Sequence, residues 1–352
     1  MRTALSTPGA PAIDWAVVDV PGPRLAAAEL SDVLRDRYGI EGRLERMAFE
    51  RDDVYRLDRA SGEPCVVRVS PSSESDLSLA LQNAALRAIA LADRALPVPR
   101  IRPSRAGSDI ESIEANAGRF RVRVLSFLSG APVLRIPRTP AMLDEIGRTL
   151  ARLDNALRTV PAPASPFPLM WDVRGAPQLR PLVPYIRNAR DRQLVDEVLA
   201  ELETEGLARI ASLPAQVIHN DFNPKNILFE AAEPKAIAGI IDFGDVVHGA
   251  RATDLGVTVS RHLEAGDAMR APEFIIRGYC ALAPISRAEA ECLFTVVRAR
   301  LAMRTAIGSW RLHQRDGRGD LAQIEDALTL LAELRDIGAA AATRAWRAHA
   351  GV

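Results

Sequence analysis

Three oxygen-bearing side chains, Asp221, Asn226 and Asp242, follow one another in an order that could carry out phosphoryl transfer. This reaction needs a carboxylate that positions and deprotonates an attacking hydroxyl, and oxygen ligands for the Mg²⁺ that neutralises the phosphates. Asp221 can serve as the base, and Asn226 with Asp242 can supply the metal ligands. Taken singly, each is also an ordinary turn or capping residue. The ordered set, with apolar runs on each side, favours the chemical interpretation.

Short apolar runs must position these side chains. Residues 217–218 and 227–229 are predicted to be buried strands, so residues 219–226 form the loop that joins them. Asn223 and Pro224 favour a tight turn within this loop. A third apolar run, residues 237–241, ends immediately before Asp242. His219 is expected to brace the loop by hydrogen bonding rather than to act as a base.

The first third of the chain predicts a small antiparallel sheet with one helix, residues 75–93. Five strands are expected, at residues 44–49, 54–58, 64–69, 100–102 and 119–127. A further helix, residues 25–38, precedes the first strand and ends at Gly39. After residue 130 the pattern is mainly helical, with helices expected at residues 139–157, 193–213, 253–263, 272–282, 286–306 and 321–348.

These elements predict an α+β, protein-kinase-like bilobal fold with a small N-terminal sheet and a larger, mainly helical C-terminal lobe. Residues 1–23 hold four prolines and are expected to form a loosely attached arm. Residues 24–126 are expected to form a nucleotide-binding lobe, and residues 127–352 a catalytic and substrate-binding lobe. The boundary is placed near residues 126–130, and a nucleotide would lie between the lobes.

Composition narrows the class of partner. The chain has 352 residues, of which 48% are hydrophobic and 26% charged, and its 45 basic residues balance its 45 acidic residues. This balance gives no reason to expect a nucleic acid or an anionic membrane as partner. Cys65, Cys280 and Cys292 lack metal-ligand spacing, and a run of eighteen uncharged apolar residues does not occur. We therefore expect a cytoplasmic protein, whose oligomeric state the sequence does not indicate.

Several strings resemble the aminoglycoside phosphotransferase and choline kinase superfamily, and most nearly its hydroxylysine kinase-like branch. They are Tyr38-Gly39, Glu50-Arg51-Asp52, the run Gln82-Asn-Ala-Ala-Leu86, Pro97-Val-Pro99, Trp171-Asp172, His219-Asn-Asp221 with Asn226, the run Ile241-Asp-Phe-Gly-Asp-Val-Val-His248, and Asp254-Leu255. They cover about two thirds of the chain in consistent order. The resemblance implies the same roles for Asp221, Asn226 and Asp242 as the residues themselves suggest.

The resemblance also implies a nucleotide site. Ser126, Phe127 and Leu128 match the hinge whose backbone meets the purine, and Arg51 is a candidate phosphate contact in the loop that covers the nucleotide. Arg68 occupies the strand position that usually carries the phosphate-binding Lys, and Gln82 the helix position whose Glu would pair with it. Arg can still bind phosphate, whereas Gln82 could hold Arg68 only through a neutral hydrogen bond.

The expected function is a Mg²⁺-dependent kinase that transfers the γ-phosphoryl group of ATP or GTP to a small-molecule hydroxyl acceptor. By the resemblance, this acceptor carries amines and is a hydroxylysine-like amino alcohol or an aminoglycoside. Asp245 and Glu264 are candidate acidic contacts for these amines. Two alternatives stay open, a kinase acting on peptide or protein side chains and a pseudokinase that only binds nucleotide.

Overall fold

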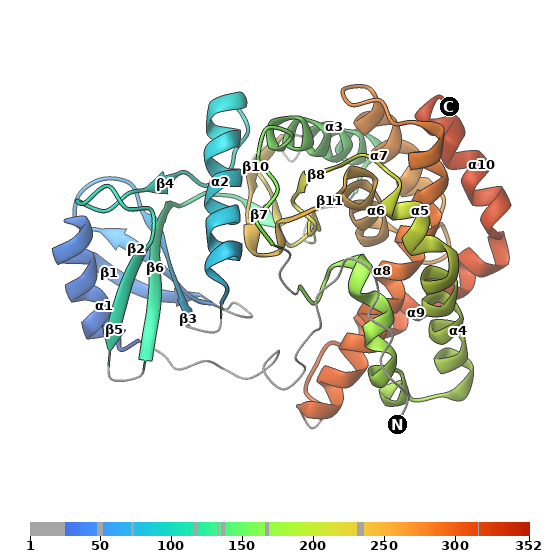
Figure 1. Cartoon of the computed structure of the whole chain (residues 1–352), viewed down its shortest axis with the longest axis horizontal. Coiled ribbons are helices and arrows are strands. Elements are labelled where there is room, and N and C mark those ends of the chain that lie inside the picture. Colours follow the sequence, from blue (N-terminus) through green and yellow to red (C-terminus); the bar gives the residue numbers. More distant parts are fainter. Residues whose placement is uncertain are drawn as a thin grey trace. The chain divides into compact units, whose positions relative to one another are not determined.

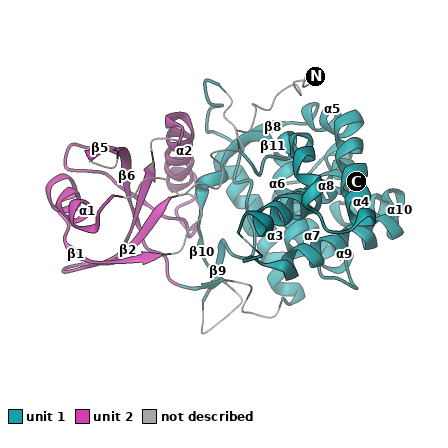
Figure 2. Ribbon diagram, turned by 90° about the horizontal axis from the view of Figure 1, so that it is seen from below, with its two compact units in different colours: residues 1–14, 130–352 teal, residues 15–129 magenta. Residues whose placement is uncertain are grey.

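The computed structural model describes residues 25–47, 52–71, 74–115, 118–132, 134, 138–165, 169–230, 236–315 and 317–352. The described residues form two compact units, one ending at Ser129 and the other beginning at Gly130 (Figure 2). The expected arm, residues 1–23, and the candidate phosphate contact Arg51 lie outside the described residues. The functional division into lobes remains a prediction.

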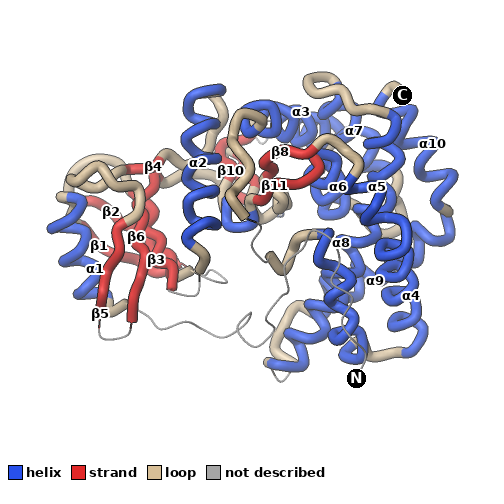
Figure 3. The backbone as a smooth tube through the Cα atoms, viewed as in Figure 1, coloured by secondary structure: helices blue, strands red, loops and turns tan. Residues whose placement is uncertain are grey.

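The unit that ends at Ser129 contains an antiparallel sheet of six strands within the described residues (Figure 3). The strand order is β1-β2-β3-β6-β4, and β5 pairs with β6. The strands are β1 (Gly42–Met47), β2 (Asp53–Arg59), β3 (Cys65–Pro71), β4 (Ile101–Arg102), β5 (Glu111–Ala115) and β6 (Gly118–Ser126). The expectation of five strands was wrong because it omitted β5, whose sequence Glu-Ser-Ile-Glu-Ala offers one large apolar residue.

Two helical segments cover opposite faces of this sheet (Figure 1). They are α1 (Ala27–Val33), which continues into the π-helical turn η1 (Leu34–Tyr38), and α2 (Asp76–Ala92). Leu30, Leu34 and Tyr38 pack on an apolar face that includes Val67 and Val122, and the Tyr38 hydroxyl donates to the Val122 carbonyl at 2.9 Å. Each such buried aliphatic side chain contributes roughly 1.5–3 kcal/mol. Because side chains alternate along a strand, the other face carries the polar residues that meet α2.

The second unit, from Gly130 onward, is mainly helical, with two small antiparallel sheets in its described part. One sheet has the order β10-β9-β7 and the other pairs β11 with β8. The strands are β7 (Ala131–Pro132), β8 (Ala215–Ile218), β9 (Ile227–Phe229), β10 (Ile237–Ile240) and β11 (Val247–Ala250). The α-helices are α3 (Pro140–Leu157), α4 (Ala189–Glu201), α5 (Leu207–Ala211), α6 (Arg251–His262), α7 (Arg270–Cys280), α8 (Arg287–Gln314), α9 (Leu321–Ile337) and α10 (Ala339–Ala350). Other helical segments are the 3₁₀ segments η3 (Val173–Tyr185) and η5 (Phe243–Asp245) and the π-helical segment η4 (Leu202–Gly206).

Helix α3 illustrates how the sequence specifies this unit. Thr139 caps its first turn by accepting a hydrogen bond from the Met142 amide at 3.3 Å, and Pro140 occupies the first helical position. Its apolar residues at helical spacing are buried: Leu143, Ile146, Leu150, Leu153 and Leu157. At Gly147 an added Cβ would lie 2.1 Å from the Ile275 carbonyl oxygen, so the backbones of α3 and α7 approach too closely for a side chain there.

Two departures from the expected helices have local causes. The helix expected over residues 321–348 is two helices, because Gly338 adopts a φ of +81° that ends α9 before α10 begins. The 3₁₀ segment η3 was not predicted, since its three prolines interrupt any helical period. No helix in the described ranges is long and apolar enough to cross a lipid bilayer.

Candidate active site

Strand pairing brings two of the predicted site residues to one place. The loop 219–226 leaves β8 and enters β9, and β9 pairs with β10 so that Ile227 faces Ile240. The Asn226 carbonyl accepts a hydrogen bond from the Ile241 amide at 2.9 Å. Asn226 therefore lies at the end of the β9–β10 hairpin where the chain continues to Asp242.

Asp221 is held beside Asn226. The Asn226 amide nitrogen Nδ2 donates to Asp221 Oδ2 at 2.9 Å and to the Asp221 carbonyl at 3.0 Å. The predicted tight turn between them is confirmed, because Asn223 Oδ1 accepts the Lys225 amide at 2.8 Å. These contacts use the nitrogen of the Asn226 side chain and leave its oxygen as the atom that can face a cation.

The carboxyl group of Asp221 is tuned by its surroundings. Burial raises the pKa of Asp221 to about 7, and the negative charge of Asp245 adds to this rise. Arg300 opposes the rise, since its Nη2 lies 3.3 Å from Asp221 Oδ1. Asp221 is therefore poised between its neutral and charged forms near neutral pH.

Arg300, which the sequence reasoning missed, lies on α8 with a side chain only 2% exposed. Its guanidinium carbon is 5.0 Å from the centroid of the Trp171 ring, and it donates to the Trp171 carbonyl. The Trp171-Asp172 string is thus connected to Asp221 through Arg300. Helix α8 carries several arginines, so neither the burial of Arg300 nor its partner could be read from the sequence.

Asp242 adopts an uncommon backbone conformation. Within the described ranges, Asn220 (φ 62°) and Asp242 (φ 61°) are the non-glycine residues with positive φ. Asn and Asp tolerate this left-handed region better than other side chains. Asp242 also accepts a hydrogen bond from the Gly244 amide at 3.3 Å. Backbone strain of this kind gathers at functional sites, and here it occurs at the start of the loop and at the candidate metal ligand.

His219 braces the loop, as predicted. Its ring lies 4.7 Å from the Phe243 ring centroid, and its Nδ1 accepts the Asp221 amide at 3.3 Å. Burial lowers the pKa of His219, which favours the neutral ring. The ring therefore contacts both the residue after Asp242 and the backbone of Asp221.

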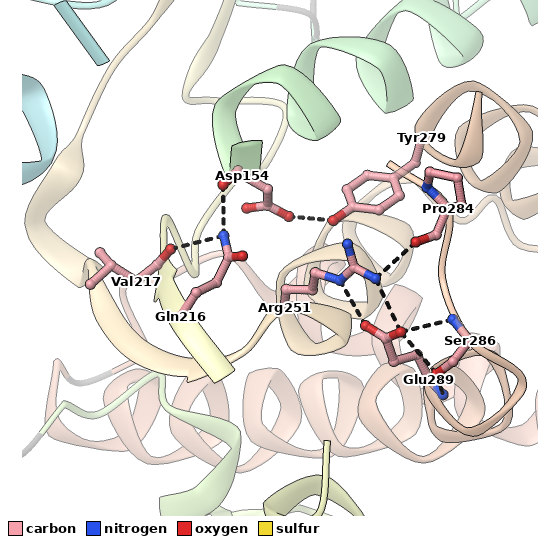
Figure 4. Close-up of polar contacts among 8 residues, drawn as sticks. All are labelled: Asp154, Gln216, Val217, Arg251, Tyr279, Pro284, Ser286 and Glu289. Atoms are coloured by element: carbon pink, nitrogen blue, oxygen red, sulfur yellow. Dashed lines mark hydrogen bonds and ion pairs between the residues drawn. The ribbon is translucent and has the colours of Figure 1, made fainter. Parts of the chain in front are cut away.

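A buried acidic residue, Asp254, anchors the start of the loop. Its two carboxylate oxygens accept the amides of His219 at 2.8 Å and Asn220 at 2.9 Å. Asp254 lies close to Asp154 of α3, whose pKa is raised well above its usual range by burial and by the charge of Asp254. Asp154 accepts a hydrogen bond from the Tyr279 hydroxyl at 2.6 Å (Figure 4). Asp254 belongs to one of the strings on which the family resemblance rests, but no role was predicted for it. Asp154 was not identified from the sequence.

The side-chain oxygens of the two predicted metal ligands suit the predicted cation. One carboxylate, Asp242, and one amide oxygen, Asn226, match Mg²⁺, which is usually bound through one or two carboxylates with the phosphates completing its shell. Of the two predicted substrate contacts, Asp245 is buried and acts on the pKa of Asp221. Glu264 instead pairs with Arg138, with 3.3 Å between Oε1 and Nε.

In the unit that ends at Ser129, the predicted partner of Arg68 is corrected. Arg68 Nε donates to Asp52 Oδ2 at 2.9 Å. Gln82 Oε1 accepts a hydrogen bond from Arg123 at 2.9 Å, so Gln82 holds Arg123 rather than Arg68. Arg123 faces Arg68 across the β3–β6 pair and also lies 3.8 Å from Asp52. No role in pairing was predicted for Asp52, and Arg123 was missed.

The predicted hinge consists of Ser126, the last residue of β6, and the two residues that follow it. The Ser126 amide donates to the Arg100 carbonyl at 2.9 Å, and the Phe127 amide donates to the Pro64 carbonyl at 3.3 Å. The Arg56 guanidinium carbon lies 4.6 Å from the centroid of the Phe127 ring. Leu128 follows and is half-buried. Their contact with a purine remains a prediction.

Comparison with known proteins gives the family. The family model described as "Phosphotransferase enzyme family" matches residues 47–292. Hydroxylysine kinase of Danio rerio is 22% identical over 338 residues, which cover 92% of this chain and 95% of that protein. The microcompartment-associated aminopropanol kinase superposes with a TM-score of 0.74 at 18% identity, over 91% of this chain and 100% of that structure.

A third relative carries a nucleotide analogue. Amicoumacin kinase hAmiN, in complex with AMP-PNP, Ca²⁺ and Ami, superposes with a TM-score of 0.62 at 15% identity, over 90% of this chain and 94% of that structure. The solved structures confirm the α+β, kinase-like fold. The family implies a nucleotide co-substrate and a divalent cation. The chain belongs to the phosphotransferase enzyme family and is a phosphotransferase that acts on hydroxyl groups.

Proposed function

We propose that the protein transfers the γ-phosphoryl group of ATP or GTP to the hydroxyl of a small amino alcohol, with Mg²⁺ as the cation. The observation that carries the proposal is the 2.9 Å hydrogen bond from Asn226 Nδ2 to Asp221 Oδ2, made where β9 pairs with the strand that leads to Asp242. A base candidate and two oxygen ligands thereby share one end of a small sheet.

Asp221 is the proposed base. Phosphoryl transfer passes through a loose transition state, so a base contributes mainly by orienting the hydroxyl in line with the phosphorus. Asn226 and Arg300 fix the two oxygens of Asp221, which sets the direction from which a hydroxyl can approach. With its pKa at about 7, the Asp221 carboxylate can also take the hydroxyl proton as the ester forms.

Asn226 and Asp242 are the proposed ligands of Mg²⁺, which when bound neutralises charge on the phosphate oxygens. In the other unit, Arg68 is the proposed phosphate contact, because a guanidinium can bind phosphate through two hydrogen bonds. Asp52 would orient the Arg68 side chain for this contact. Ser126, Phe127 and Leu128 would meet the purine, as the family resemblance implies.

The proposed acceptor is an amino alcohol. The names of two relatives, hydroxylysine kinase and aminopropanol kinase, describe acceptors of this kind. The buried carboxylate of Asp245 beside Asp221 supports an ammonium group near the reacting hydroxyl. Glu264 is a weaker candidate because it already pairs with Arg138.

Replacement of Asp221 tests the proposal. Phosphate-ester formation is measured with ATP or GTP, Mg²⁺ and a panel of amino alcohols and aminoglycosides. Asp221→Asn should lower kcat by about 10³-fold, within the range of a lost general base. Its thermal shift with nucleotide and Mg²⁺ should match that of the unaltered protein.

Asp336→Asn is the matched control, because Asp336 is 74% exposed on α9 and should leave turnover unchanged. Equal turnover in Asp221→Asn would refute the role of Asp221. A nucleotide-dependent thermal shift without turnover on any acceptor would favour a binding-only protein, and activity only on peptides would favour a peptide kinase.

A further inference from the structure

Three arginines form a cluster in the unit from Gly130 onward, and two of them, Arg300 and Arg261, act on Asp221. Arg300 and Arg304 are four residues apart on α8, so they lie on the same face of that helix. Arg261 lies on α6, which packs against α8 closely enough that a Cβ on Gly256 would be 2.5 Å from Val296 Cγ1. The charges of Arg304, Asp221 and Arg300 all act on Arg261.

These three guanidinium groups are unequally neutralised. Arg300 contacts Asp221 at 3.3 Å, and Arg304 reaches Asp326 of α9 only at 3.5 Å. Arg261 has no hydrogen bond or ion pair with any residue that the structure describes, and its Nε is buried without a partner. Nearby Asp172 is already bound by Arg174, with 2.6 Å between Asp172 Oδ2 and Arg174 Nη2.

The electrostatic consequence is that the charge of Arg261 is poorly compensated. Burial lowers the pKa of Arg261 to about 9, and the positive charge of Arg304 lowers it further than Asp221 can restore. A buried cation without a partner is unfavourable, so the protein retains Arg261 at a cost to its own stability. A bound anion would remove that cost.

We propose that Arg261 and Arg304 bind the carboxylate of the acceptor, which is therefore a hydroxy amino acid rather than a carboxylate-free amino alcohol or an aminoglycoside. The inference rests on the proposed function and specifies its substrate class. Asp221 orients the hydroxyl, Asp245 faces the ammonium group, and the two arginines hold the carboxylate. Guanidinium groups suit this role because they bind a carboxylate through two parallel hydrogen bonds.

The test compares acceptors that differ only in their carboxylate. The pairs are 5-hydroxylysine with 5-hydroxylysinamide and threonine with 1-amino-2-propanol, each assayed with ATP and Mg²⁺ on the full chain. The unaltered protein should favour the carboxylate member of its preferred pair by about 10²-fold in kcat/KM, since a site built for a polar group rejects the analogue that lacks it. Arg261→Gln should bring this ratio close to one, mainly by raising KM for the carboxylate member.

Two further variants complete the design. Arg287→Gln is the matched control, because Arg287 is 69% exposed on α8 and pairs with Glu291 at 2.7 Å. It should keep the full preference for the carboxylate. Arg304→Gln should reduce the preference as Arg261→Gln does. Arg261→Gln should also have a melting temperature at least as high as the unaltered protein, because the substitution removes a buried like charge.

The other outcomes are distinct. If Arg261→Gln lowers kcat/KM equally for both members of a pair, the arginines act on the phosphoryl group and the inference is overturned. The inference also fails if the carboxylate-free members are preferred, although the proposed function then stands. If no hydroxy amino acid, amino alcohol or aminoglycoside is phosphorylated, the proposed function fails, and the inference fails with it.

Discussion

Two carboxylates, Asp52 and Asp221, have opposite electrostatic surroundings, one in each unit. Asp52 lies between two arginines, 2.9 Å from Arg68 and 3.8 Å from Arg123. Asp221 contacts one arginine, Arg300, and has a second carboxylate, Asp245, acting against its charge. Neighbouring charges, rather than residue type, therefore decide whether an Asp orients other side chains or can exchange a proton.

The largest effect on stability is expected when the charge of Asp52 between its two arginines is removed. Asp52→Asn keeps the size of the side chain but leaves Arg68 and Arg123 without its charge. Removal of one partner of a buried ion pair is strongly destabilising, and we expect a loss of about 3 kcal/mol in the free energy of unfolding. Urea unfolding followed by circular dichroism measures this loss.

Asp58→Asn is the control for Asp52→Asn. Asp58 is 32% exposed on β2 and pairs with Arg56 at 2.7 Å. A pair this exposed contributes at most about 1 kcal/mol. Equal losses in the two variants would contradict the view that Asp52 compensates buried charge.

The surroundings of Asp221 should determine the pH dependence of the reaction. Because burial and Asp245 raise the pKa of Asp221 to about 7, the base is protonated as the pH falls below that value. We expect kcat/KM to fall tenfold per pH unit on the acidic side, with an apparent pKa at or below about 7 because a bound cation lowers it. Initial rates between pH 5 and 9 would give the profile.

Asp245→Asn sharpens this prediction. The variant removes a negative charge that raises the pKa of Asp221, so the acidic limb should move to lower pH. An acidic limb at the same pH in this variant would show that Asp245 does not influence the base. Asp336→Asn, on the exposed face of α9, should leave the limb in place.

The sequence revealed the parts of the site that are local. Asp221 and Asn226 are five residues apart within one loop, so their proximity follows from strand-loop-strand patterning. Asp254 and Arg300 reach this loop from α6 and α8, and their contacts depend on helix packing that periodicity does not specify. The fold class was predictable because apolar runs and turn residues recur regularly, whereas β5 was not, since it buries little apolar surface.

The predicted pairing of Gln82 with Arg68 was wrong for a related reason. Gln82 was expected to pair with Arg68, but β6 places Arg123 opposite Arg68, and the Gln82 side chain binds Arg123. A sequence pattern shows which residues point to one face of a strand. It does not show which of two like charges a helix residue meets.

The smallest effect concerns the stability contribution of Asp221 itself. Its folded-state pKa of about 7 lies above its ordinary value of 3.8, so the folded state favours the neutral form. This contribution to stability is fully present below pH 4 and is lost as the pH rises through 7. Asp221→Asn resembles the neutral form at every pH. It should therefore have a free energy of unfolding about 1 kcal/mol larger than that of the unaltered protein at pH 8. This is well below the roughly 4 kcal/mol that a rise in pKa from 3.8 to about 7 would give, because the Asp221 side chain is 21% exposed and solvent screens its charge.

The advantage should shrink toward zero as the pH falls from 8 to 4, because Asp221 then becomes neutral in the unaltered protein as well. Thermal or urea unfolding at several pH values, without nucleotide, measures this convergence. The net sign already includes Arg300, whose attraction for the charged form is outweighed by burial and by Asp245. A variant that is less stable at pH 8 would mean that the Arg300 contact dominates, and Asp221 would then resemble Asp52 as a partner of arginine.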